Sequence, residues 1–328
     1  MPASTIAERF TPTQHELAKF STSPDYMVRE FFKDSLPTAL TPKKPTHAVW
    51  APVHVAPYKT QFRSFSLDAE SLGRVLSRCR AHGTTLTGLF QALSFASLAA
   101  QLGAHEALAF ESGTALSMRR FLPSRPPSHP WVEPDKAIGN FVSMMSHVFG
   151  KNIVSRVRGL AHDGNPLDGE LEKVIWEVAA TVRGEIESKI KSGIRNDVVG
   201  LMRFVTDWRA QLRETTHKLR EHSWLVTNLG VLDGTALTAA AEPHEQIQQG
   251  NKDEQADSDT SSRNWSIDWA EFIVSADVSS AAIVISPVAV KGGDLVVATS
   301  WQDCVLGAGF GDRFVANFER WTRQLAAV

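Results

Sequence analysis

The stretch His222–Gly234, with the sequence HSWLVTNLGVLDG, constrains the fold of this chain more than any other feature. Residues 224–226 form an apolar run that is typical of a strand. Gly230 and the Asp-Gly pair at the end of the stretch supply backbone angles that residues with a Cβ atom tolerate poorly. The pattern therefore predicts a strand that ends at Thr227 and Asn228 and opens onto a loop or hairpin. Asn228 either faces a pocket there or hydrogen-bonds its own turn.

Apolar periodicity along the rest of the chain predicts strands alternating with helices. Leu86–Leu102 is apolar or small nearly all round, which is typical of a helix buried on every side. Val142–Phe149 is apolar on both faces and predicts a central strand. The run Lys291–Asp294 joins two apolar segments and predicts a hairpin. The expected strands lie at 62–67, 107–118, 142–149, 224–226, 281–290 and 295–301, and the expected helices at 69–82, 86–102, 168–191, 197–217 and from 312 onward.

The charge balance and the cysteine count limit the partners and the compartment. The 328 residues include 34 Lys and Arg against 36 Asp and Glu, so the formal net charge is −2 and no nucleic acid is expected as a partner. No run of about eighteen apolar residues predicts a membrane span, and no signal peptide is recognisable. Only two cysteines, Cys79 and Cys304, occur, which indicates a reducing compartment. A cytoplasmic protein is therefore expected.

Two segments are predicted to lack regular structure. Residues 1–61 carry five prolines between Pro37 and Pro57, a density that excludes helix and central strand. Apart from an amphipathic piece at Tyr26–Phe32, this region is interpreted as an irregular proline-rich connector. Residues 242–263 hold six acidic residues against two basic ones and almost nothing apolar. This second segment is predicted to be a disordered acidic insertion at the surface.

The chain lacks the familiar motifs of several chemistries. No metal is expected, because two distant cysteines and eleven scattered histidines show no paired ligand spacing. Neither a phosphate-binding GxxxxGK[ST] loop nor a strand-borne GxGxxG nor a GxSxG elbow occurs. The turn His162–Gly164 is interpreted as a solvated loop rather than an active site. Arg119 and Arg120 either clamp an anionic ligand or form a pair of surface arginines, the commoner arrangement. Catalytic residues are therefore unknown at this level.

Four short signatures, in the right order, carry a family resemblance. They are the helix start Cys79–Leu89 (CRAHGTTLTGL), Ser117–Arg120 (SMRR) together with Ile138–Val142 (IGNFV), Thr227–Gly230 (TNLG), and Thr299–Gln302 (TSWQ). Together they resemble the second half of the coenzyme-A-dependent acyltransferase superfamily, and within it the fungal alcohol O-acetyltransferases are the most similar. None of the four is specific alone; their order across residues 62–328 is what favours the resemblance.

The resemblance implies an α/β fold in which a mixed sheet is flanked by helices, a chloramphenicol-acetyltransferase-like subdomain. Residues 62–328 would form the second subdomain of such an enzyme, and residues 1–61 would be a remnant of the first. In the family a channel runs between the two halves, and Thr227, Asn228 and Gly230 would line it, in contact with substrate and CoA. The HxxxDG motif, whose histidine deprotonates the acceptor hydroxyl in the family, has no match in this chain.

Two functions of different class follow from the resemblance. The first is an acyl-CoA-dependent alcohol O-acyltransferase of secondary metabolism. It would transfer an acetyl group from acetyl-CoA, a co-substrate rather than a bound cofactor, directly to the hydroxyl of a small-molecule alcohol. The second is a truncated, non-catalytic relative that keeps the fold as a binding or interaction module. An exposed edge of the final hairpin would also offer a surface for pairing with a second copy.

Overall fold

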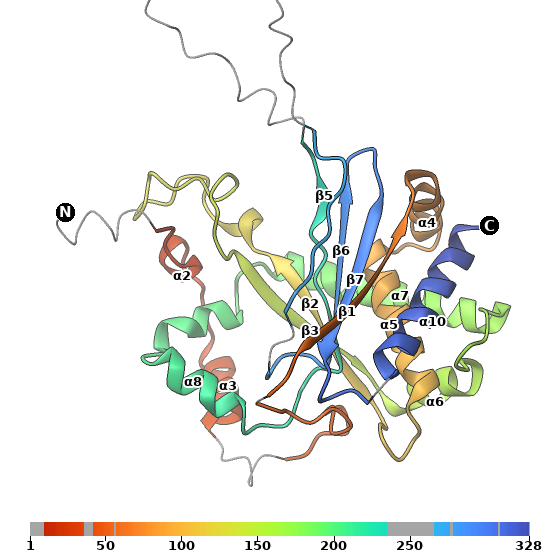
Figure 1. Cartoon of the computed structure of the whole chain (residues 1–328). Helices are drawn as coiled ribbons and strands as arrows, with labels where there is room; N and C mark the ends of the chain where they lie inside the picture. The colour runs from red at the N-terminus through yellow and green to blue at the C-terminus, as the bar shows by residue number, and fades with distance from the viewer. Residues whose placement is uncertain are drawn as a thin grey trace, which may run out of the picture.

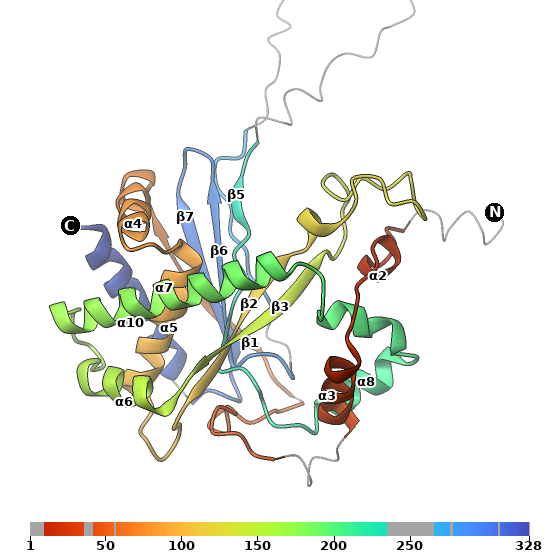
Figure 2. The same ribbon diagram turned by 180° about the vertical axis from the view of Figure 1, so that it is seen from behind.

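A mixed sheet covered by helices on one face forms the centre of the molecule. The computed structural model describes residues 10–35, 42–55, 57–234, 266–275, 278–307 and 309–327. In Figure 1 the strands run through the middle, and Figure 2, from behind, shows α7 lying across the sheet with α5, α6 and α10 beside it. The helices α2, α3 and α8 gather on the side of the sheet away from α10. The predicted combination of a mixed sheet and flanking helices is confirmed.

The elements follow one another in an order close to the predicted one. The strands are β1 (Thr60–Leu67), β2 (Phe110–Ser117), β3 (Val142–Phe149), β4 (Trp224–Val226), β5 (Gly230–Leu232), β6 (Ile283–Val290) and β7 (Leu295–Gln302). The α-helices are α2 (Gln14–Leu17), α3 (Pro24–Ser35), α4 (Ala69–Ala81), α5 (Leu86–Gln101), α6 (Lys151–Leu160), α7 (Gly169–Ser192), α8 (Trp208–Thr215) and α10 (Phe310–Ala326). Two 3-10 helices, η2 (Arg119–Phe121) and η3 (Val198–Phe204), complete the described elements.

The sheet has the strand order β1-β7-β6-β4-β2-β3, with β5 also paired to β6. β6 and β7 form the predicted antiparallel hairpin, whereas β4 runs parallel to both β6 and β2. The hairpin lies inside the sheet, because β1 pairs with β7 and β4 and β5 pair with β6. The expectation of an exposed hairpin edge is therefore wrong, since strands distant in sequence cover both of its sides. Among the described strands, β1 and β3 end the main strand order, and β5 is paired on one side only.

The strand predicted at residues 224–226 is present as β4 and opens onto the irregular residues 227–229, but the second strand continues along β6 and does not form a hairpin. β4 and β5 both pair in parallel with β6, at Trp224 opposite Ile283 and at Gly230 opposite Val288. Gly230 lies six residues after Trp224, whereas its partner Val288 lies only five residues after Ile283. The segment from β4 to β5 therefore contains a bulge of one extra residue near Asn228. Gly230 has a φ of +79°, a conformation that favours glycine. Asn and Gly are typical of both turns and bulges, so local sequence could not separate the two.

Helix caps and a shared core hold the helices on the sheet. Asp68, Thr85 and Asp168 cap α4, α5 and α7, each accepting a backbone N–H from the first turn. The inner stripe of α7 is buried, as is helix α5, which was predicted to be buried on every side. The apolar stripe of α10 is also buried. It consists of Phe314, Phe318, Trp321 and Leu325.

β3 was predicted to be a central strand and is instead an edge strand. Its apolar residues Val142, Met144 and Val148 are exposed, whereas Ser143 and His147 on the opposite face are buried. The prediction was wrong because it took apolar character on both faces as a sign of burial. The two buried polar side chains, Ser143 and His147, lie on the face that the helices cover. Hydrogen bonds within the protein offset the cost of burying them there.

Two further predictions on the irregular regions need correction. The connector predicted to be irregular at residues 1–61 also contains α2, whereas α3 includes the amphipathic piece expected at Tyr26–Phe32. Leu17 and Phe20 pack in a second small core with Met118, Phe141 and Val199. The helix predicted at 197–217 is divided into η3 and α8, because Asp197 and Asp207 each cap a separate short helix. The predicted acidic insertion at 242–263 lies outside the described residues.

Membrane spans can be assessed only for the described helices. Within those ranges, no helix combines the length and the apolar character that crossing a bilayer requires.

Candidate functional site

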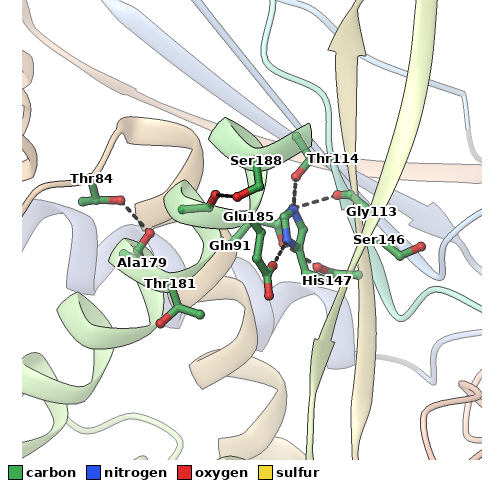
Figure 3. Close-up of polar contacts among 12 residues, drawn as sticks. Thr84, Gln91, Gly113, Thr114, Ser146, His147, Ala179, Thr181, Glu185 and Ser188 are labelled. Atoms are coloured by element: carbon green, nitrogen blue, oxygen red, sulfur yellow. Dashed lines mark hydrogen bonds and ion pairs between the residues drawn. The ribbon is translucent and has the colours of Figure 1, made fainter. Parts of the chain in front are cut away.

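A buried amide is the centre of a polar network between the sheet and α5 (Figure 3). The Gln91 Nε2 group donates to the Gly113 carbonyl at 2.7 Å and to the Thr114 hydroxyl at 2.8 Å. The Gln91 Oε1 atom accepts from the Ser112 hydroxyl at 2.8 Å and from the Trp224 indole N–H at 2.6 Å. Gln91 is fully buried, so these bonds replace the water that its amide would lose on folding.

The same network continues into a histidine and a carboxylate. His147 Nε2 lies 2.9 Å from the Thr114 hydroxyl, and His147 Nδ1 lies 2.5 Å from Glu185 Oε2 on α7. Because the Thr114 oxygen already accepts from Gln91, its O–H is directed to His147 Nε2, and the Nδ1–H then donates to the Glu185 carboxylate. Burial lowers the pKa of His147, against the opposing effect of Glu185. The imidazole is therefore neutral at pH 7.

A cavity of about 290 Å³ adjoins the Glu185 side of this network. Its lining includes His147, Glu185, Glu177 and apolar side chains of α7 and β3. The His147 side chain is only 1% exposed, and both of its ring nitrogens are engaged. A neutral, doubly bonded imidazole cannot accept a further proton without breaking this network. The network of Gln91, Thr114, His147 and Glu185 is therefore suited to holding β2, β3, α5 and α7 together.

A second polar cluster lies on the open face of the sheet, the face opposite the helices. Ser146 neighbours His147 on β3 and so points to that other face. Its hydroxyl lies 2.8 Å from His222 Nε2, and the same nitrogen is 3.9 Å from Glu111 Oε1. Thr46 donates to the other carboxylate oxygen of Glu111 at 3.1 Å. We call Ser146, His222 and Glu111 the open-face cluster.

The open-face cluster has the chemistry of a proton acceptor within reach of solvent. The His222 side chain retains 11% exposure, and Ser146 is exposed. Val148 and Met144 flank it on β3 and are 63% and 44% exposed. The Glu111 carboxylate would stabilise an imidazolium on His222 by charge attraction. The Ser146 contact shows that a hydroxyl can lie within hydrogen-bond distance of His222 Nε2, the distance at which a general base acts.

The three predicted channel residues lie at the bulge between β4 and β5. Asn228 Nδ2 donates to the Thr87 hydroxyl on α5 at 3.2 Å, and Asn228 Oδ1 accepts the Gly230 N–H at 2.8 Å. Thr227 donates its backbone N–H to the Ile285 carbonyl at 2.9 Å. The side chain of Asn228 thus bonds its own turn and also ties the bulge to the start of α5. Asn228 and Thr227 are partly buried, and Gly230 is exposed.

The other sequence candidates have structural partners. The Arg119 guanidinium donates to the carbonyls of Pro134 and Ala137 and lies over the Phe141 ring, so Arg119 holds a loop rather than clamping an anion. His162 is exposed, which agrees with the predicted solvated turn. Asp163 accepts from Asn317 of α10 at 2.8 Å.

No group of three or more possible metal ligands occurs within the part of the chain that the structure describes. Cys79 and Cys304 are both free, and burial raises the pKa of the Cys79 thiol to about 12. A thiol with that pKa carries almost no thiolate at neutral pH, so Cys79 is not a nucleophile.

Sequence reasoning missed both histidine clusters. Their members come from five separated segments, around residues 91, 111–114, 146–147, 185 and 222, and no local motif joins them. One signal was available: polar Ser143, Ser146 and His147 interrupt an otherwise apolar strand. Polar residues at such positions indicate either partners in the core or a functional face.

Comparisons with known proteins agree with this fold. No family model matches the sequence. The chain is 26% identical over 313 residues to a probable alcohol acetyltransferase of Fusarium pseudograminearum, covering 94% of this chain and 55% of that protein. It thus spans about half the length of the curated relative that it matches.

Two solved structures are similar to this chain. Trichothecene 15-O-acetyltransferase of Fusarium sporotrichioides matches with a TM-score of 0.54 and 14% identity, covering 85% of this chain and 50% of that one. A cyclization-docking bidomain of Sorangium cellulosum matches with a TM-score of 0.48 and 15% identity, over 98% of this chain and 50% of that one. The predicted resemblance is confirmed at the level of the fold by the first of these.

Proposed function

We propose that this chain, which has the fold of the coenzyme-A-dependent acyltransferases, acts in the transfer of an acetyl group from acetyl-CoA to an alcohol hydroxyl. The observation that carries the proposal is the sequence similarity to a probable alcohol acetyltransferase along 94% of the chain. The product is an ester, and we assign the reaction to secondary metabolism. The sparse, free cysteines favour a cytoplasmic setting.

The chemistry requires one group that removes the proton of the alcohol. We assign this role to His222, because its Nε2 atom meets a hydroxyl on the open face, whereas the imidazole of His147 is sealed in the core. His222 Nε2 accepts the proton as the alcohol oxygen bonds to the thioester carbonyl carbon. The carbon–sulfur bond then breaks, and the departing thiolate takes the proton from His222. The products are the ester and free coenzyme A.

We further assign the bulge to the acyl-CoA channel, with Thr227, Asn228 and Gly230 along its wall. Bulges frequently lie next to active sites, because they redirect side chains and backbone groups from a regular strand. The partly buried amide of Asn228 lies at such a position, between the sheet and the start of α5. In this assignment the three residues help to bind the thioester and take no part in the proton transfer.

A thiol-release assay tests the proposed activity. The purified chain is incubated with acetyl-CoA and a panel of small alcohols, and free coenzyme A is measured with a thiol reagent. We expect release that depends on the alcohol and is accompanied by ester, detected by gas chromatography. Reactions without alcohol measure simple hydrolysis and serve as the control. Release no greater than this control across the panel would contradict the proposal and favour the alternative, a non-catalytic binding module.

Replacing Asn228 by alanine is expected to raise the KM for acetyl-CoA about tenfold. The change removes two hydrogen bonds of the bulge, each of which contributes about 1 kcal/mol to stability. A lower melting temperature alone would indicate a purely structural role. Thr87→Val removes only the bond to α5 and is the matched control for the loss of stability. Equal values of KM in Asn228→Ala and Thr87→Val would contradict the channel assignment.

A further inference from the structure

A second cavity, of about 350 Å³, lies far from both histidine clusters in the sequence. Its wall consists of α2 and the residues that follow it, the loop at Pro127 and Ser128, and η3. In Figure 1 this region is at the side of the sheet away from α10. The proposed acyl transfer uses none of these residues. The cavity is therefore a candidate site in its own right.

Two permanent cations lie at the rim of this cavity. Lys19 and Arg203 both line it and are both exposed. Arg203 donates one N–H to the Thr22 hydroxyl at 3.2 Å and lies over the Phe204 ring, and neither cation is in an ion pair with any residue that the structure describes. The remaining N–H groups of a guanidinium present a fork that matches two oxygens of one anion.

The single carboxylate in the lining does not neutralise these cations. Glu16 is held at the start of α2, where its Oε2 atom accepts the Thr13 N–H and the Thr13 hydroxyl, each at 2.8 Å. These hydrogen bonds lower the pKa of Glu16, so its carboxylate stays ionised and is held at the helix cap, which leaves one positive charge in excess among Lys19, Arg203 and Glu16. An anion in the cavity would therefore meet two positive groups at the rim.

An imidazole nitrogen buried in the wall of the cavity also lacks a partner within the described part of the chain. His15 also lines the cavity, and its Nδ1 atom is buried without a hydrogen-bond partner among the described residues. A buried polar atom without a partner costs about 1–3 kcal/mol, so such atoms are rare unless a ligand or water satisfies them. Leu17 and Phe20, each 2% exposed, give the cavity an apolar floor.

We propose that this cavity binds a ligand that carries a phosphate group. Lys19 Nζ and the Arg203 guanidinium donate to the phosphate oxygens, and the apolar floor receives the non-polar part of the ligand. A phosphate provides several acceptor oxygens at once, which matches an ammonium and a guanidinium that come from two separate segments. The ligand is either free phosphate or the phosphates of a nucleotide, and the experiment separates these sources.

Isothermal titration calorimetry of the whole chain tests the proposal. The probes are inorganic phosphate and adenosine 3′,5′-bisphosphate, each titrated at low and at high sodium chloride. We expect saturable binding of at least one probe, weakened by salt because the contacts are ionic. Binding of inorganic phosphate alone identifies a free anion, and tighter binding of the bisphosphate identifies a nucleotide. No binding of either probe overturns the proposal.

Matched variants connect the binding to this cavity. Arg203→Gln is expected to weaken binding about tenfold or more, because it removes a charge-assisted donor pair. Lys19→Gln tests the same point through an exposed residue that the fold does not depend on. Arg209→Gln, an exposed arginine at the start of α8, is the control and should bind as tightly as the parent chain. Equal affinities of all three variants overturn the proposal, whether or not the chain transfers acetyl groups.

Discussion

Replacing His222 by glutamine is expected to lower kcat for acetyl transfer by about 100-fold or more. The glutamine amide can still hydrogen-bond the Ser146 hydroxyl, but it cannot accept a proton at neutral pH. General-base catalysis typically contributes factors of about 10²–10⁴, so its loss dominates every smaller change at the site. The steady-state rate of coenzyme A release is the measurement. The melting temperature is measured alongside, because the side chain of His222 is only 11% exposed and its replacement can also lower stability.

His162→Gln is the matched control for this prediction. His162 is exposed in the turn between α6 and α7 and belongs to neither histidine cluster, so the same substitution there should leave kcat unchanged. The acid limb of the pH profile of kcat/KM is the second measurement, since it reports the base of the free enzyme. A His222→Gln protein with the parental kcat and the parental acid limb would show that another group removes the proton.

Replacing Gln91 by leucine is expected to destabilise the fold by about 3 kcal/mol or more. Leucine has a similar volume, so packing is conserved and the change removes only polar interactions. The Trp224 indole N–H and the Ser112 hydroxyl lose their acceptor, and Thr114 loses a donor. Each unsatisfied buried group costs about 1–3 kcal/mol. Domains are commonly stable by only about 5–15 kcal/mol, so the midpoint of urea unfolding should fall markedly.

Ser94 provides a control on the same helix. It is fully buried on α5, one turn from Gln91, and its hydroxyl has no hydrogen-bond partner among the described residues. Ser94→Ala should therefore be neutral or slightly stabilising, because it removes a buried polar atom that makes no bond. If Gln91→Leu and Ser94→Ala unfold at the same urea concentration, the network does not contribute the stability that we assign to it.

Much of the fold could be predicted from the chain, because periodicity and caps are local signals. The apolar stripe of α10, the cap at Asp168 and the hairpin of β6 and β7 all follow from residues close in sequence. The bulge at Asn228 could not be predicted, because its defining partner is β6, more than fifty residues away. β3 was predicted to be a buried central strand, but it is an edge strand with one face exposed. The sequence could not show this, because the helices that cover its other face are distant in sequence.

The candidate sites show the same division. The resemblance directed attention to Thr227, Asn228 and Gly230, and their assignment to the acyl-CoA channel stays a prediction. Neither histidine cluster has a sequence motif. Glu111, Ser146 and His222 come together only because β2 lies between β3 and β4 in the sheet.

By itself, the sequence determined the class of fold, the order of its elements and the family resemblance, because apolar period, capping residues and short signatures act within a few residues. Tertiary structure alone decided which strand lies at the edge, where the bulge falls and which of two histidines reaches the open face. Those outcomes depend on pairing between segments far apart in the chain. Local residues set a strand's alternation, but only its neighbours decide which side is buried.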